Sequence, residues 1–394
     1  MTGSTDTQLP ARIAKDEFEA RQQRARELAS ARGLQGLLVW GRGGGTQDRY
    51  ADLYYLTDYY SQYPLVHDKQ GWSARGHGAL VLPVKGPSRL IVDMPVFRDD
   101  LAVADDVIYS EDVASAAADA LVSAVPYGSI GIMGSEALAW QWREVFRAAL
   151  GPRLIEADSL GRELRLLKSD AELQIMRAAG RLGTRAVEAI MDAAVPGATE
   201  ADLAAAGIEV IIRGGGAFHG MGLSCGAHAD AYGHSQPAAY DGRYVLREGD
   251  MARVDLYGSV DGYVFDLGRT CVVSGRPTDD QQAMLDAARQ SVLAGIGKVG
   301  PGVPMSEVAR VCEDTLAGSE FARRGSSAPL TGFPWGHNLG LAFEAPWIEA
   351  SSTTTIVPRM CLCVEKRLAR AGVGGTTYED DLIVTENGCE VITG

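Results

Sequence analysis

The chain has 394 residues, of which 46% are hydrophobic and 22% are charged, and these values are typical of a globular protein with two domains. Its formal net charge of −14 argues against nucleic acid or an anionic membrane as a partner, because both attract basic surfaces. The sequence has no apolar leader near its first residue and no apolar run of about 18 residues that could span a bilayer. We therefore expect a cytoplasmic protein.

The first part of the chain alternates helical and extended patterns, which together predict a complete α/β domain. The predicted elements are a helix near 15–32 that ends at Gly33, a strand over 36–41, two strands over 79–94 joined by a Gly-Pro turn, and short strands at 129–134 and 153–158 on either side of a helix near 136–150.

A second domain begins with a helix near 168–191, where Ser169 and Glu172 have the spacing of a capping box. Further helices are predicted from about Thr199 and over 278–296 and 305–317. The domain boundary is expected near 159–167, which divides the chain into residues 1–162 and 163–394.

The six cysteines form no CxxC pair and no spacing typical of a small disulfide-rich scaffold. We therefore expect buried, reduced thiols rather than disulfides or a zinc site.

The stretch VDLYGSVDGYVFDLGRT at 254–270 has the composition of a buried hairpin, yet it carries Asp255 and Asp266 within its strands. A turn centred between Val260 and Asp261 would place these two residues directly opposite each other. Two carboxylates roughly 5 Å apart on one face destabilise a hairpin unless a cation neutralises them. The hairpin therefore predicts a bound cation.

The pattern recurs over 361–388, where a turn centred on Gly372 would place Glu365 opposite Glu379. Between the two hairpins, GFPWGHNLGLAFEAPW contains His337 in a glycine-containing run. Four carboxylates and one neutral imidazole carry a charge of about −4, which two divalent ions would cancel, and such a donor set suits Mn²⁺, Fe²⁺, Co²⁺ or Zn²⁺.

The residues Asp255, Asp266, His337, Glu365 and Glu379, in this order, resemble the metal ligands of the pita-bread metallohydrolases, which include methionine aminopeptidase, aminopeptidase P and prolidase. The flanking text agrees: EGDMARVDLYGSVDGYVFDLGRT, PWGHNLGL and YEDDLIVTENGCEVIT resemble the blocks that surround these ligands in the family. In the first domain, YADLYYLTDYY is similar to the YLTG strand of creatinase, prolidase and aminopeptidase P.

The resemblance implies an α/β (α+β) architecture: a pita-bread catalytic domain with a pseudo-twofold antiparallel sheet, preceded by a smaller α/β domain of the creatinase type. It implies a homodimer. Asp255 would hold one ion and His337 the other, while Asp266 and Glu379 would bridge them. Glu365 would bind an ion and transfer a proton. The segment LSCGAHADAYGHSQP resembles the part that supplies a substrate-facing histidine, which is best matched by His234.

The chain departs from the peptidase pattern near its substrate groups. The second histidine of the peptidases is missing, and Phe343 or Glu344 takes its place, depending on the alignment. The arginine two residues before the second Glu ligand becomes Thr377. We therefore expect an enzyme that hydrolyses an amide or related C–N bond of a dipeptide or small metabolite and is not a standard Xaa-Pro peptidase, with Glu344 or His234 as a further acid–base group.

Three alternatives stay open at this point. One is a non-hydrolytic lyase of the DMSP-lyase type, which shares the fold and also has a shortened E-x-P spacing after its histidine. The second is an Xaa-Pro dipeptidase or aminopeptidase. The third is a metal-binding protein without catalytic activity.

Overall fold

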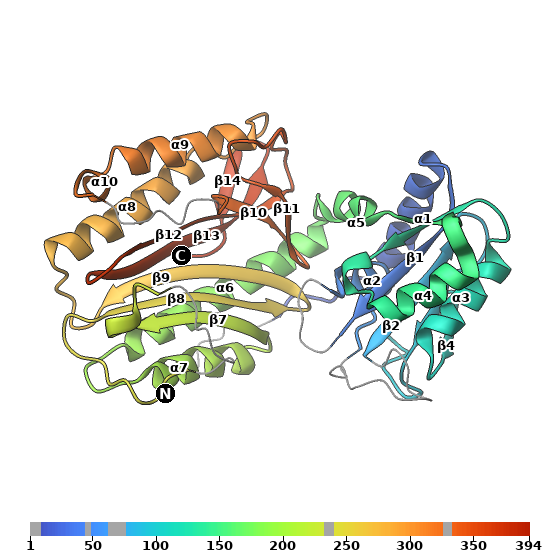
Figure 1. The fold of residues 1–394 in the computed structure, drawn as a ribbon, viewed down its shortest axis with the longest axis horizontal. Coiled ribbons are helices and arrows are strands. Elements are labelled where there is room, and N and C mark those ends of the chain that lie inside the picture. The colour runs from blue at the N-terminus through green and yellow to red at the C-terminus, as the bar shows by residue number, and fades with distance from the viewer. Residues whose placement is uncertain (1–8, 44–48, 62–75, 232–239, 326–332) are drawn as a thin grey trace. The chain divides into compact units, whose positions relative to one another are not determined.

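The computed structural model describes residues 9–43, 49–61, 76–231, 240–325 and 333–394. These residues form two compact units, which are coloured along the chain in Figure 1. One unit comprises residues 12–166, and the other comprises residues 167–394 together with residues 9–11.

The first unit contains a six-stranded mixed sheet of strand order β4-β3-β2-β1-β5-β6. Its strands are β1 (Leu34–Arg42), β2 (His77–Pro83), β3 (Arg89–Val92), β4 (Asp106–Tyr109), β5 (Ser129–Met133) and β6 (Leu154–Glu156). Its α-helices are α1 (Lys15–Ala31), α2 (Ala51–Thr57), α3 (Val113–Ala124), α4 (Trp140–Leu150) and α5 (Asp158–Arg165). The elements predicted from the sequence for this part are confirmed, with one exception.

The exception is YADLYYLTDYY, whose resemblance implied a strand but which forms helix α2. All residues of this helix except Tyr54 are buried, so the segment lacks the alternation of buried and exposed residues that is typical of a half-buried strand. The helix ends at Asp58, whose φ of 53° is left-handed and typical of a helix end.

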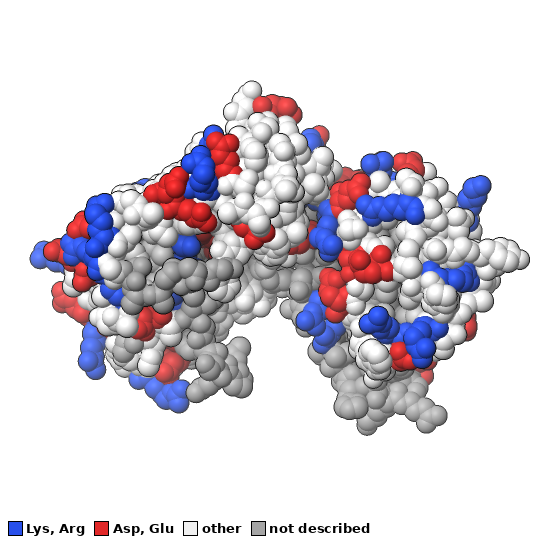
Figure 2. All heavy atoms as spheres, turned by 45° about the horizontal axis from the view of Figure 1, so that its top comes forward, with Lys and Arg blue, Asp and Glu red and all other residues white. Residues whose placement is uncertain are grey.

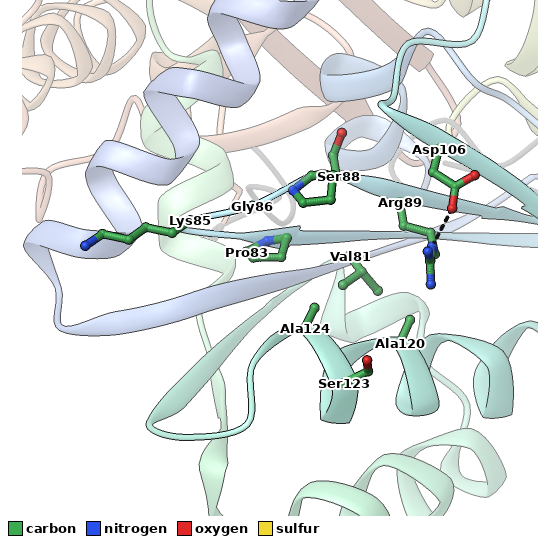
Figure 3. Close-up of a pocket in the computed structure, with 11 residues that line it drawn as sticks. Val81, Pro83, Lys85, Gly86, Ser88, Arg89, Asp106, Ala120, Ser123 and Ala124 are labelled. Atoms are coloured by element: carbon green, nitrogen blue, oxygen red, sulfur yellow. Dashed lines mark hydrogen bonds and ion pairs between the residues drawn. The ribbon is translucent and has the colours of Figure 1, made fainter.

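The core of this unit contains an aromatic cluster at the start of β2. The His77 ring packs against Trp40 and Trp142, with ring centroids 5.2 and 4.4 Å away, and the two tryptophan rings lie 5.9 Å apart. Phe146 packs edge-on against Trp40. A cavity of about 250 Å³ lies near the end of β2, where Arg89 and Asp106 form an ion pair of 2.7 Å (Figure 3). Arg89 and Asp106 thus neutralise each other's charge beside the cavity.

The second unit contains two antiparallel sheets. The three-stranded sheet has the order β7-β8-β9, and the five-stranded sheet has the order β11-β10-β12-β13-β14. The strands are β7 (Ala217–Cys225), β8 (Met251–Val260), β9 (Tyr263–Val272), β10 (Gly336–Leu339), β11 (Phe343–Trp347), β12 (Cys361–Arg370), β13 (Gly374–Thr385) and β14 (Gly388–Val391).

Helices cover the outer faces of these sheets: α6 (Asp170–Ala193) packs on β8 and β9, and α8 (Asp279–Ile296) packs on β12 and β13. Each acid-bearing hairpin is therefore covered by its own helix, as Figure 1 shows, and this is the pseudo-twofold arrangement of the pita-bread fold. The remaining helices are α7 (Glu200–Arg213), α9 (Met305–Ala317) and α10 (Glu320–Arg323). The capping box of Ser169 and Glu172 at the start of α6 is confirmed.

The register of the first hairpin differs from the prediction. Asp255 lies opposite Gly268, and Asp266 lies opposite Tyr257, so the two aspartates are not directly opposed. The reason is the turn, which consists of Asp261 and Gly262 with φ values of 46° and 81°. A two-residue turn with both φ values positive centres the hairpin one residue later than we assumed. Because the shift in pairing is two residues, both aspartates still point to the same face.

Charged side chains are dispersed over the surface. On the face drawn in Figure 2, Lys and Arg side chains alternate with Asp and Glu side chains over both units. Among the described residues, none of the helices combines the length and apolar composition that a membrane span requires.

Candidate metal centre

The two sheets of the second unit meet along β9 and β13. The backbone N–H of Asp266 donates to Asp381 Oδ2 at 3.0 Å, and the backbone N–H of Thr377 donates to Thr270 Oγ1 at 3.0 Å. These bonds hold Asp266 on β9 next to Glu379 on β13.

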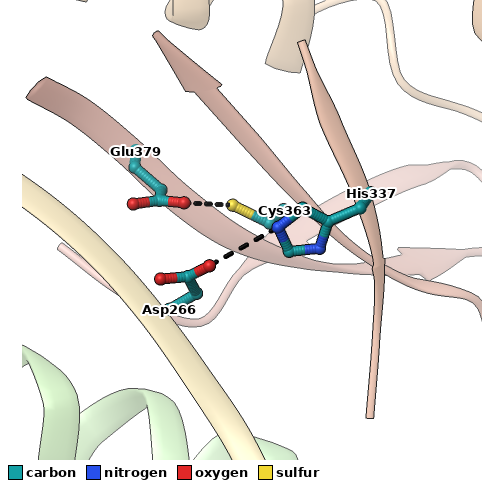
Figure 4. Close-up of side chains that lie close together, drawn as sticks. All are labelled: Asp266, His337, Cys363 and Glu379. Carbon is teal, nitrogen blue, oxygen red and sulfur yellow. Dashed lines mark hydrogen bonds and ion pairs between the residues drawn. The ribbon is translucent and has the colours of Figure 1, made fainter. Parts of the chain in front are cut away.

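Four donor residues converge at this seam: Asp266, His337, Cys363 and Glu379. One ligand atom from each lies within 4.8 Å of the others, and all four residues are buried. Figure 4 shows the carboxylates, the imidazole and the thiol pointing toward a common centre. His337 Nε2 lies 3.4 Å from Asp266 Oδ2, and the Cys363 thiol donates to Glu379 Oε1 at 3.0 Å.

The orientation of His337 suits a metal ligand. Its Nδ1 lies 3.1 Å from the backbone carbonyl of Asn338. A carbonyl oxygen only accepts hydrogen bonds, so Nδ1 carries the proton and Nε2 presents its lone pair to the cluster. Burial lowers the pKa of His337, which keeps the ring neutral, as a metal ligand must be.

Asp255 and Glu365 flank this cluster, and both form an ion pair with the side chain of Arg367. The guanidinium of Arg367 lies 2.8 Å from Asp255 Oδ2 and 2.9 Å from Glu365 Oε2. The other oxygen of Glu365, Oε1, lies 3.8 Å from His337 Nε2. The structure thus brings together all five residues that the sequence singled out, and the predicted pairing of Glu365 with Glu379 across the ladder is confirmed.

A glycine makes room for this convergence. Gly268 lies opposite Asp255 on β9. A Cβ at this position would approach Glu379 Oε2 to 3.0 Å and would clash with the methyl group of Thr377. The missing side chain lets the β13 carboxylate approach the first hairpin.

The cluster is strongly acidic and deeply buried. Burial raises the pKa values of Asp266 and Glu379 well above those of ordinary carboxyl groups, and repulsion between the neighbouring carboxylates raises both values further. Burial also raises the pKa of Glu365, and the Arg367 guanidinium partly offsets this effect. Such a group of carboxylates is stable in the ionised form only with a cation among them.

The residues present fit a divalent transition metal. Asp266 Oδ1 and Glu379 Oε2 are buried and have no hydrogen-bond partner among the described residues, so both oxygens are available as ligands. Together with the imidazole and the thiol they form a mixed oxygen, nitrogen and sulfur donor set. Such a set suits Zn²⁺, Co²⁺ or Fe²⁺ better than Mg²⁺ or Ca²⁺.

One predicted residue, Glu344, is not among the four residues of this cluster. Glu344 lies opposite Asn338, whereas Phe343 lies on the face of His337, with ring centroids 5.2 Å apart. Because side chains alternate along a strand, Glu344 is expected on the face of β11 opposite to that of Phe343, and its acid–base role stays a prediction. The structure thus places the Phe343 ring, and not the Glu344 carboxylate, in contact with His337. His234 lies outside the described residues.

Three residues at the site were not singled out by the sequence: Cys363, Arg367 and Asp381. The first two share a face of β12 with Glu365, because residues two apart on a strand point to the same side. This alternation could have identified both of them. All six cysteines are free, as expected, and one of them, Cys363, lies within the candidate metal cluster, which the sequence did not predict.

Comparison with known proteins agrees with this geometry. The relatives include a probable dipeptidase PepE of Mycobacterium bovis, which is 31% identical over 242 residues, covering 61% of this chain and 62% of that protein. The chain thus matches less than two thirds of the length of this relative. The solved structures include dipeptidase PepE from Mycobacterium ulcerans, with a TM-score of 0.77, 25% identity and coverage of 98% of this chain and 97% of that chain. A prolidase from Thermococcus sibiricus has a TM-score of 0.80 at 18% identity, covering 98% of both chains.

Two family models match the chain. The creatinase/prolidase N-terminal domain matches residues 21–167, and the model of metallopeptidase family M24 matches residues 174–386, which is more than half of the chain. The second match contains every residue of the metal cluster. The chain is a member of metallopeptidase family M24.

Proposed function

We propose that the protein is a divalent-metal-dependent hydrolase that cleaves an amide or related C–N bond in a dipeptide or a metabolite of similar size. The observation that carries this proposal is the convergence of Asp266, His337, Cys363 and Glu379, with Asp255 and Glu365 beside them. Membership of family M24 and the similarity to dipeptidases and prolidases support a hydrolytic reaction. We expect two ions per subunit, with Mn²⁺, Fe²⁺, Co²⁺ and Zn²⁺ as the candidates.

When bound, a divalent ion supplies a Lewis acid and a water molecule of lowered pKa. The residues of the chain supply the rest. Asp266, His337 and Glu379 would hold the ion, and all three residues are buried. Glu365 has one carboxylate oxygen directed toward the cluster, so it can take a proton from the attacking water and pass it to the leaving nitrogen.

Three aromatic rings border the site on the side of His337. Phe343 packs against His337 and against Tyr257, with the second pair of centroids 5.7 Å apart, and Trp347 lies 5.7 Å from His337. This apolar border replaces a hydrogen-bond donor of the peptidases with a surface that suits an aliphatic or ring-shaped part of a substrate. We therefore propose that generic Xaa-Pro dipeptides are poor substrates.

A substrate panel tests the proposal. The protein is loaded with Mn²⁺ or Co²⁺ and incubated with Ala-Pro, Gly-Pro and Met-Pro, with other dipeptides, and with small amides, cyclic amidines and sulfonium compounds. Hydrolysis in ¹⁸O-labelled water places the label in the new carboxylate, whereas a lyase reaction does not. Labelled product from a compound other than an Xaa-Pro dipeptide supports the proposal, and efficient cleavage of the three proline dipeptides contradicts the proposed specificity.

A matched pair of variants tests the role of the centre. Asp266→Asn removes a ligand carboxylate, and we expect it to abolish turnover. Asp261→Asn makes the same chemical change in the turn of the same hairpin, where the positive φ of 46° is one that Asn tolerates. We expect this variant to retain activity. Equal activities of the two variants would contradict the assignment of the centre.

A further inference from the structure

Arg367 joins the two acid-bearing hairpins at the candidate metal centre. Its guanidinium donates to Asp255 Oδ2 from Nη2 and Nε, at 2.8 and 3.2 Å, and Nη2 also lies 2.9 Å from Glu365 Oε2. The side chains of Asp255 and Glu365 are only 3% and 8% exposed, and that of Arg367 is 16% exposed. One partly buried cation therefore contacts a carboxylate from each of the two sheets.

The contact fixes the direction in which Glu365 presents its carboxylate. Oε2 is held by the guanidinium, while Oε1 lies 3.8 Å from His337 Nε2. A planar guanidinium with several N–H groups restricts the rotation of a carboxylate more than a single ammonium does. Arg367 thus leaves one oxygen of Glu365 directed toward the cluster.

The residue directly opposite Arg367 in the β12–β13 ladder is Thr377. Thr377 stands where the resemblance to the peptidase pattern implies an arginine, and here the side chain is short and buried. Directly opposed residues have Cβ atoms roughly 4.5–5.5 Å apart, so a guanidinium from either strand can reach the same carboxylates. The space beside the two carboxylates therefore holds one guanidinium, which comes from the strand with the long side chain, while the opposed residue is short.

We propose that Arg367 is a positioning residue that orients Asp255 and Glu365 for ion binding, and that it supplies from β12 the guanidinium that Thr377 lacks on β13. Only the effect on turnover rests on the proposed hydrolase function. The effect on the ion site can be read without any substrate.

The experiment compares Arg367→Thr with the exchange variant that combines Arg367→Thr and Thr377→Arg. Each protein is loaded with Co²⁺, and its visible spectrum, which reports the number and geometry of the ligands, is recorded together with the number of ions bound. We expect Arg367→Thr to alter the spectrum at an unchanged ion count, and to lower kcat/KM about 10–100-fold. The exchange variant is expected to restore the spectrum and to bring kcat/KM back to within about tenfold of the parent, since one guanidinium again serves both carboxylates.

Lys366→Thr is the control, because it removes the same charge from the neighbouring residue. The Lys366 ammonium lies 4.0 Å from the centre of the Trp335 ring, on the other face of β12. We expect the parent spectrum from this variant. If Arg367→Thr does not fold, Arg367→Lys gives the same test, because a single ammonium does not reproduce the guanidinium contacts.

Two outcomes would overturn the inference. An unchanged Co²⁺ spectrum in Arg367→Thr and Arg367→Lys would show that the guanidinium does not orient the ligands. A gain of one bound ion in Arg367→Thr would show that the guanidinium takes the place of an ion. Absence of turnover with every substrate, combined with the expected spectra, would count against the proposed function and not against this role of Arg367.

Discussion

The close approach at Gly268 allows the metal centre to be perturbed without changing any ligand. In Gly268→Ala, the new methyl group would clash with Thr377 and would lie 3.0 Å from Glu379 Oε2. Overpacking of this kind costs about 1–3 kcal/mol, and the lower chain entropy of alanine in the unfolded state offsets about 0.4–1 kcal/mol of it. We expect a net loss of about 1–2 kcal/mol, which corresponds to a fall of about 2–8 °C in the melting temperature of the second unit.

Gly222→Ala is the matched control, because Gly222 flanks Asp255 from the other side, on β7. A Cβ there would meet the Asp255 Cβ at 3.6 Å, which is an ordinary contact. We expect this variant to melt at or slightly above the temperature of the parent. Calorimetry measures both changes, and a titration with Mn²⁺ should show about 10–100-fold weaker binding for Gly268→Ala alone. Equal melting temperatures and metal affinities for the two variants would refute the reasoning.

Three further predictions concern single side chains. In Co²⁺-loaded protein, we expect Cys363→Ser to lose a sulfur-to-cobalt charge-transfer band in the near ultraviolet, and a parent spectrum without that band would show that the thiol is not a ligand. Glu365→Gln should lower kcat by about 10²–10⁴ with little change in melting temperature, because it removes the proton acceptor and keeps the size of the side chain; full activity would exclude that role. Burial lowers the pKa of His77 from 6.5 to about 3, so the unfolded chain takes up a proton below pH 6.5 that the folded chain does not, and the free energy of unfolding of the first unit should fall by about 2 kcal/mol between pH 7 and pH 5. His77→Phe should remove this loss, as denaturant unfolding at the two pH values can measure, and an equal loss in both proteins would contradict it.

The sequence predicted the positions of the ligands better than their contacts. Glu365 and Glu379 were placed opposite each other correctly, because a loop centred on a glycine has an unambiguous middle residue. The pairing of Asp255 and Asp266 was misjudged by two residues, because it depends on which two residues form the turn. The predicted side of the sheet on which each aspartate lies is still correct, because a register shift of two residues does not change the face to which a side chain points.

Contacts within one sheet can be predicted from strand alternation, but contacts between the two sheets cannot. The approach of Cys363 to Glu379 is of the first kind, because it follows from alternation along β12 once Glu365 is placed. The bridge from Arg367 to Asp255 does not, because it joins strands of different sheets whose relative position depends on the packing along β9 and β13. Which of Phe343 and Glu344 lies beside His337 depends on the pairing of β10 with β11, whose register shifts between His337 and Asn338.

Two hydrogen bonds between β9 and β13 can report the separation of the two sheets of the second unit. The amide protons of Asp266 and Thr377 are bonded to side-chain oxygens of the opposite sheet rather than to a neighbouring strand of the same sheet. Their exchange with deuterated solvent therefore requires the two sheets to separate, whereas most other strand amides require the loss of a strand from its own ladder. An ion bound across the seam would slow exchange at these two amides first, so they would measure how firmly the metal holds the halves of the unit together.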